Sequence, residues 1–139
     1  MILRFMVAFV LCGGALGQAP ASWPCQAEIH KADPNATFIR VSDRVMNGMA
    51  DKKVMPDISD LKGKDLDLLV IVQVLIAPDG DVRCFQLQEG DSNLARRSLD
   101  AAQKWHYRPY MLNGQAINVE TWIRFSYKKD GVDVVLQDR

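Results

Sequence analysis

Residues 66–89 read LDLLVIVQVLIAPDGDVRCFQLQE, and this stretch contains the strongest strand signal of the chain. Its first half, 66–77, is almost continuously apolar and β-branched, which predicts a strand that is central in a sheet or covered on both faces. The turn PDGD at 78–81 follows, in which proline fixes φ and glycine supplies the left-handed residue of a tight reversal. Residues 82–89 are therefore expected to return antiparallel, with a bulge near Arg83 and Cys84 where the two-residue apolar period breaks.

Downstream of this hairpin, a helix and one more strand are predicted. Asp91 or Ser92 can cap a helix that runs to about Trp105, and the chain must leave helical geometry before Pro109. Small and apolar side chains share one stripe of this helix: Ala95, Ser98, Leu99, Ala102 and Trp105. After a turn at Asn113-Gly114, residues 117–127 alternate between apolar and mostly polar side chains, which indicates a strand with one buried face.

Upstream of the hairpin, a short helix over about 42–51 is predicted, with Ser42 as its cap, followed by an irregular connection over 52–64. Residues 18–37 contain three prolines and no apolar period, and are expected to form an extended leader. The element order is helix, strand, strand, helix, strand. We therefore predict an α+β domain over 38–129, an antiparallel three-stranded sheet packed by helices, with a polar tail at 130–139.

The first seventeen residues are typical of a signal peptide. Arg4 precedes the apolar run 5–12, and small residues follow up to Gly17. Cleavage after Gly17 is expected, with Ala19 or Ala21 as alternative sites. The run is shorter than the roughly 20 apolar residues that span a bilayer, so an uncleaved anchor is the weaker interpretation.

Composition bounds the class of function. The 139 residues are 48% hydrophobic and 24% charged, which suits one soluble globular domain. Seventeen basic residues balance seventeen acidic ones, with a pI near 6.7. No basic field exists to attract a phosphate backbone, so nucleic acid is not expected as a partner.

The candidate chemistry is sparse. After export, Cys25 and Cys84 can pair as one disulfide, or remain two thiols with Cys84 packed as a small hydrophobe. A catalytic pair of Cys84 and His106 lacks a suitably spaced third group, and the two histidines form no zinc pattern. The acidic residues between the first helix and the hairpin, Asp57, Asp60, Asp65 and Asp67, lack the glycine and terminal glutamate of a calcium loop. We therefore predict no catalytic residue, no metal and no cofactor.

Three linked pieces of the chain resemble the C-terminal domain of TonB, the periplasmic energy transducer of Gram-negative outer-membrane transport. The turn 77–82 is similar to the family's DG-x-V junction, and Gly90 with the helix that follows is similar to its central segment. Most specific is 105–115, WHYRPYMLNGQ, which resembles the tryptophan-proline-glycine pattern before the last strand. Residues 46–56 resemble the entry segment, so the resemblance covers about 40–128.

The resemblance implies a non-enzymatic periplasmic domain that binds outer-membrane transporter peptides, similar to the TonB box, in energy-coupled transport. Its mechanism is strand addition at the free edge of the last strand. The implied partner-binding residues are Ile117, Val119, Thr121, Trp122, Ile123 and Phe125. Trp122 is expected on the mostly polar face of this strand, where packing in the core does not account for a large aromatic side chain. An inner-membrane proton-channel complex is a further implied partner, and an uncleaved signal would tether the domain to that membrane.

The sequence departs from a full transducer at two points. Only about twenty residues separate the signal from the domain, where force-carrying members have a long proline-rich spacer. Pro56 is followed by Asp57-Ile58-Ser59, where many members carry a Tyr-Pro pair. Two alternatives therefore stay open: a stand-alone domain that dimerises through an edge strand, and an exported thiol enzyme that uses Cys84.

Overall fold

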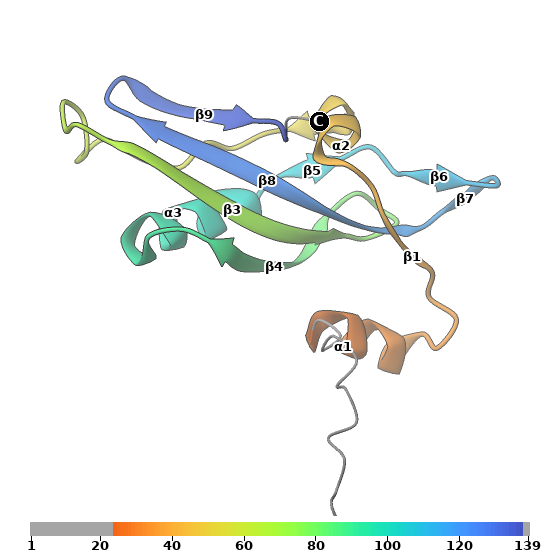
Figure 1. The fold of residues 1–139 in the computed structure, drawn as a ribbon. Coiled ribbons are helices and arrows are strands. Elements are labelled where there is room, and N and C mark those ends of the chain that lie inside the picture. Colours follow the sequence, from red (N-terminus) through yellow and green to blue (C-terminus); the bar gives the residue numbers. More distant parts are fainter. Residues whose placement is uncertain (1–23, 138–139) are drawn as a thin grey trace, which may run out of the picture.

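The computed structural model describes residues 24–137. Its elements follow the chain in this order (Figure 1): α1 (Pro24–Ala32), β1 (Phe38–Arg40), α2 (Asp43–Met49), β2 (Ala50–Lys52), β3 (Asp67–Ile76), β4 (Val82–Glu89), α3 (Ser92–Ala102), β5 (His106–Tyr107), β6 (Met111–Leu112), β7 (Gln115–Ala116), β8 (Asn118–Lys128) and β9 (Gly131–Val135). The predicted α+β class is confirmed. The main sheet is five-stranded, however, whereas three strands were predicted.

The β3–β4 hairpin forms as predicted. β3 is central, since it pairs antiparallel with β4 on one side and with β8 on the other. The expected bulge lies at Arg83, because Leu75 is opposite Cys84 while Ile76 is opposite Val82. Gly80 has a φ of +93°, and a Cβ there would lie 1.8 Å from the carbonyl oxygen of Tyr107. Only glycine fits this turn, because both the left-handed backbone and the close approach exclude a side chain.

The core lies between the sheet and the helices on one of its faces. Alternate residues of β3 and β8, including Val72, Ile123 and Phe125, are at most 2% exposed and point into it. α3 packs there as predicted, with Asp91 as its N-cap, although the helix ends at Ala102 and not at Trp105. Ser98 is buried on its inner stripe, with Oγ 2.5 Å from the Tyr127 hydroxyl.

Trp105 and Arg97 fasten the irregular connection to this core. The indole N–H of Trp105 donates to the carbonyl oxygen of Val54 at 2.8 Å. Arg97 on α3 donates to both carboxylate oxygens of Asp60, at 2.5 and 2.6 Å. This hydrogen-bonded ion pair lowers the pKa of Asp60 to about 2. The segment between α2 and β3 is irregular in conformation, but its ends and its middle are held to the helix layer.

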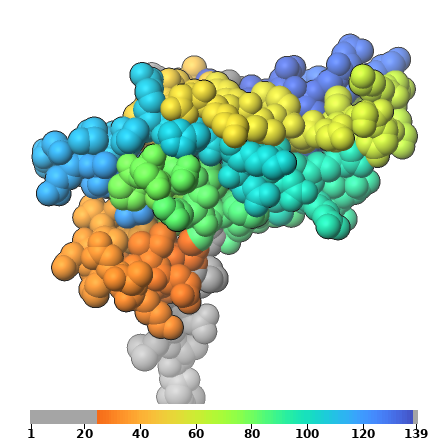
Figure 2. Space-filling view, turned by 180° about the vertical axis from the view of Figure 1, so that it is seen from behind, coloured from red at the N-terminus to blue at the C-terminus, as the bar shows by residue number. Residues whose placement is uncertain are grey.

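The expected extended leader contains a helix, α1. A proline at the first helical position is pre-set for helical φ and loses no intrahelical hydrogen bond there, which explains the start at Pro24. α1 lies on the sheet face opposite α3, because it contacts the cross-strand row formed by Cys84, Leu75 and Glu120. In the space-filling view, the orange segment with α1 and β1 forms a lobe at one end of the domain (Figure 2).

Candidate functional site

The predicted partner-binding residues all lie on or next to β8. Their side chains are buried in the core, except for Trp122: Ile117, Val119, Thr121, Ile123 and Phe125 are between 0 and 7% exposed. They line the helix-facing side of the strand, which follows the predicted alternation. On the outer edge a partner could therefore reach the backbone and the half-buried indole of Trp122, because the backbone groups of the other predicted residues within β8 face β3.

The outer edge of β8 is not free, so the expectation of an open edge is wrong. β1 pairs with it in parallel at 118–120, and β9 pairs with it antiparallel at 124–128 (Figure 1). β9 lies within the segment that was expected to be a polar tail. Between the two covering strands, Thr121, Trp122 and Ile123 have no strand partner on this edge within the described part of the chain.

Trp122 marks this gap between β1 and β9. The guanidinium carbon of Arg40 lies 5.2 Å from the centroid of its indole ring. A cavity of about 10 Å³ adjoins the gap and is lined by residues that include Asn47, Trp122 and Val134. Within residues 24–137, the buried Oδ1 of Asn47 has no hydrogen-bond partner. The cavity has room for about one water molecule.

A buried ion pair anchors the end of β9. Asp43, at the start of α2, is 6% exposed and forms an ion pair with Arg124 of β8. The same carboxylate accepts the backbone N–H of Gln137 at 3.0 Å, and Arg124 donates to the Gln137 side chain at 3.3 Å. The covering strand β9 is thus held at its end by a polar clamp, while Val132 and Val134 within it pack against the core.

Neither this clamp nor the two covering strands was predicted from the sequence. The pair Asp130-Gly131 is a hairpin signal between β8 and a short Val-rich run, and could have indicated β9. β1 carries only the short apolar signal of Phe38 and Ile39. Nothing local in the sequence indicates that Asp43 meets a residue 81 positions further along the chain.

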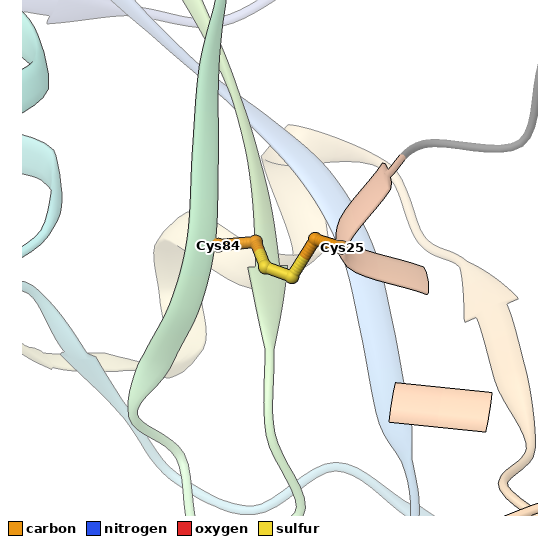
Figure 3. Close-up of a disulfide and its surroundings, with 2 residues drawn as sticks. All are labelled: Cys25 and Cys84. Carbon is orange, nitrogen blue, oxygen red and sulfur yellow. A yellow bond between two sulfur atoms is a disulfide. The ribbon is translucent and has the colours of Figure 1, made fainter. Parts of the chain in front are cut away.

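Cys25 and Cys84 form a disulfide, which confirms one of the two alternatives left open (Figure 3). Their Cα atoms are 6.1 Å apart, within the usual range for such bridges. The bridge attaches α1 to β4. Because the Cys84 sulfur is bonded to another sulfur, it is not a free nucleophile, and the thiol-enzyme alternative loses its central group.

Beside the disulfide, α1 is held to a polar network around Glu120. Gln26 donates to this carboxylate at 3.1 Å and Arg40 at 3.0 Å, and Gln73 also donates to it. Glu120 is 8% exposed. The face of the sheet opposite the core is thus polar in its middle and covered by α1 at one end.

His106 lies on β5, where it bonds to neighbouring segments. Its Nδ1 is 2.6 Å from a carboxylate oxygen of Asp51, and its Nε2 is 3.1 Å from the carbonyl oxygen of Asp79. The hydrogen bond with the Asp51 carboxylate raises the pKa of His106 above its ordinary value. Within the described residues, no group of three or more His, Cys, Asp or Glu side chains is placed to hold a metal ion.

Comparison with known proteins supports the family suggested by the motifs. Residues 64–128 match the family model described as Gram-negative bacterial TonB protein C-terminal. These residues form a TonB C-terminal domain. The match covers the sheet strands β3, β4 and β8 and the helix α3, and the family is a periplasmic, transport-related one. No curated protein and no solved structure matches the chain.

Segments outside this match complete the structure around the TonB C-terminal domain. α1, β1, α2, β2 and β9 all lie beyond residues 64–128. Among residues 24–137, no helix is both long and apolar enough to cross a membrane. The expected signal peptide at 1–17 lies outside the residues that the structure describes.

Proposed function

We propose that this TonB-like domain captures an extended peptide of an outer-membrane transporter by strand addition at the outer edge of β8. One observation carries the proposal: two short, separate strands of three and five residues cover this edge, and they leave Thr121, Trp122 and Ile123 without a strand partner among the described residues. Short edge strands share few main-chain hydrogen bonds with β8, so one of them can be exchanged for a strand of another chain. Main-chain hydrogen bonds then supply affinity, and pockets for alternate side chains supply selectivity.

β9 is the covering strand that we expect the peptide to replace. It is five residues long, its residues are half-buried or exposed, and it pairs with 124–128 through main-chain bonds. Val132 and Val134 lie opposite Tyr127 and Phe125 and pack against the core. A replacing peptide therefore needs apolar side chains at alternate positions and an extended backbone between them.

The proposed binding residues keep their places in this mechanism. Trp122 contributes its half-buried ring and its outward-facing backbone groups at the gap. The side chains of Ile117, Val119, Thr121, Ile123 and Phe125 hold the strand against the core, and the backbone groups of those within β8 face β3. The backbone groups that face the outer edge belong to the alternate residues of β8, because Asn118 and Glu120 bond to the β1 segment there. A peptide longer than β9 would extend past Arg124 into this gap, beside the indole. Transporter peptides of the kind that TonB domains bind are the partner class that we infer.

The test is an NMR titration of the exported protein with synthetic peptides from the periplasmic N-terminal segment of candidate outer-membrane receptors. We expect saturable amide shifts along 119–127 and in β9. Ser126 and Asp133 lie opposite each other, so the pair Ser126→Cys with Asp133→Cys can lock β9 onto β8. Locking should weaken peptide binding at least about tenfold, because the edge is then blocked.

The single variants Ser126→Cys and Asp133→Cys are the matched controls, since each changes one side chain without a lock. Both should bind peptide like the unchanged protein. Unchanged affinity in the locked variant would show that the peptide binds elsewhere. Absence of any saturable shift with receptor peptides would refute capture at this edge.

A further inference from the structure

The opposite edge of the main sheet is β4, whose middle, between two bulges, has a regular and exposed edge. In the described part of the chain β4 pairs with β3 alone, and residues 85–89 are exposed. Phe85 is 38% and Leu87 39% exposed, although both lie on the helix-facing side of the sheet. Natural edge strands usually carry charges or proline at their centre, which prevent pairing with other chains. The regular ladder of β4, residues 84–87, contains neither.

We propose that a second copy of this chain pairs with this edge, β4 against β4, in an antiparallel arrangement about a two-fold axis at Gln86. The two sheets would join into one continuous sheet. Such an interface is isologous, so the same short segment supplies both sides of every contact. This proposal concerns β4 and does not rest on peptide capture at β8.

The register follows from the residues of β4. In an antiparallel pair, the side chains of directly opposite residues project from the same face of the sheet. The two-fold axis must therefore pass through a residue of β4, because an axis between two residues would place side chains of opposite faces against each other. Centring on Gln86 places Phe85 opposite Leu87 of the partner copy, and the Arg83 end of one strand beside the Glu89 end of the other. Apolar side chains then meet apolar ones, and opposite charges lie together at both ends.

The neighbouring registers are worse for the same strand. Centring on Phe85 places Arg83 opposite Leu87, and it places the acidic residues Asp81 and Glu89 opposite each other. Centring on Leu87 places Phe85 opposite Glu89. Of these three registers, only the one centred on Gln86 pairs apolar residues with apolar residues and opposite charges with each other. This complementarity is expected of an edge that pairs with its own copy.

Among residues 24–137, the elements around β4 leave room for the partner. α1 starts at the disulfide on β4, but Gln26 contacts Glu120 on β8 and the ring of His30 lies 4.7 Å from Phe38 on β1. α1 therefore runs inward across the sheet, away from this edge. Arg83 already pairs with Asp79 at 2.9 Å, with both side chains more than half exposed. An exposed pair of this kind is weak, so Arg83 can redirect to Glu89 of a partner copy.

Charge reversal tests the proposal. The full chain is expressed for export, purified from the periplasm so that the disulfide forms, and its dimer Kd is measured by sedimentation at low salt. Arg83→Glu or Glu89→Arg alone creates like-charge contacts at both ends, so each should weaken the dimer about fivefold or more. The double variant Arg83→Glu with Glu89→Arg should restore the Kd, because opposite charges meet again.

Arg96→Glu, an exposed reversal on α3, is the matched control and should leave the Kd unchanged. Leu87→Lys should abolish the dimer, while its circular dichroism spectrum shows a retained fold. A monomer at every concentration would overturn the proposal. So would a dimer whose Kd is insensitive to both single reversals, or a double variant that is no better than the singles.

Discussion

At the scale of the residue, His106 gives the protein a pH-dependent contact. Its ring, on β5, forms hydrogen bonds with the carboxylate of Asp51 on β2 and with the carbonyl oxygen of Asp79 in the β3–β4 turn. Its pKa is raised in the folded state, first by the hydrogen bond with Asp51. A group with a raised folded pKa binds its proton more tightly when folded, so it stabilises the fold below its unfolded pKa of about 6.5.

We therefore expect the free energy of unfolding to fall as pH rises from 6.5 through the raised pKa of His106. Urea unfolding between pH 5.5 and 9 measures this. His106→Gln should flatten the profile, because the replacement keeps hydrogen-bonding capacity and does not titrate. An identical pH profile in the variant would show that other groups cause the slope.

Trp105 is the residue whose loss should cost the most stability. Its side chain is 2% exposed, its ring packs edge-on against Phe125 with centroids 6.2 Å apart, and its N–H bonds to Val54. Trp105→Ala should lower the free energy of unfolding by about 3–5 kcal/mol through the cavity it leaves. Trp105→Phe keeps most of the volume but loses the hydrogen bond, and should cost about 1–3 kcal/mol. Denaturant titration of both variants checks this order, and equal losses would contradict it.

At the scale of the element, α1 depends on its disulfide. The bridge spans 59 residues, and a loop of that length is worth at most about 4 kcal/mol in the chain-entropy account. Apart from the bridge, α1 is held by the Gln26–Glu120 hydrogen bond and the approach of His30 to Phe38, and its apolar side chain Ile29 is only half-buried. In Cys25→Ser with Cys84→Ser, α1 should therefore detach while the sheet stays folded.

The expected loss for this double variant is about 1–2 kcal/mol, less than the chain-entropy limit, because the native state also gains freedom when α1 detaches. Hydrogen exchange should show α1 amides without protection and unchanged protection in β3 and β8. Cys25→Ser alone, which leaves Cys84 as a thiol, should behave in the same way. Loss of protection in the sheet would show that α1 is part of the cooperative core.

Elements with strong local patterns could be predicted from the sequence, and elements held by distant contacts could not. The β3–β4 hairpin is encoded by its own apolar run and turn, and α2 and α3 by their caps Ser42 and Asp91. β1 and β9 are short and depend on pairing with β8, and α1 depends on a bridge to Cys84. These three elements are determined mainly by the segments with which they pair or bond, and less by their own residues.

In the candidate site, too, features with a local sequence pattern could be predicted, and features formed by distant segments could not. The alternation of 117–127 correctly predicted which side chains of β8 face the core. It could not show whether the strand's edge was open, because an edge is closed by other segments. The clamp of Asp43 with Arg124 and Gln137 is likewise a contact between three regions of the chain.

At the scale of the whole molecule, the sheet has two edges with different proposed partners. β8 and β4 lie on opposite sides of β3, so their outer edges are separated by the full width of the three strands. Neighbouring strands are about 4.8 Å apart, so at least about 10 Å of sheet lies between the two sites. A peptide at β8 and a second copy at β4 therefore do not compete for backbone groups.

This separation predicts that peptide binding and self-association are independent. Peptide affinity measured by calorimetry should be the same below and above the dimer Kd, with one peptide bound per chain. Arg83→Glu should weaken the dimer without changing peptide affinity, and the β9 lock should block the peptide without changing the dimer. If copies instead paired through β8, peptide would dissociate the dimer and its apparent affinity would fall as protein concentration rises.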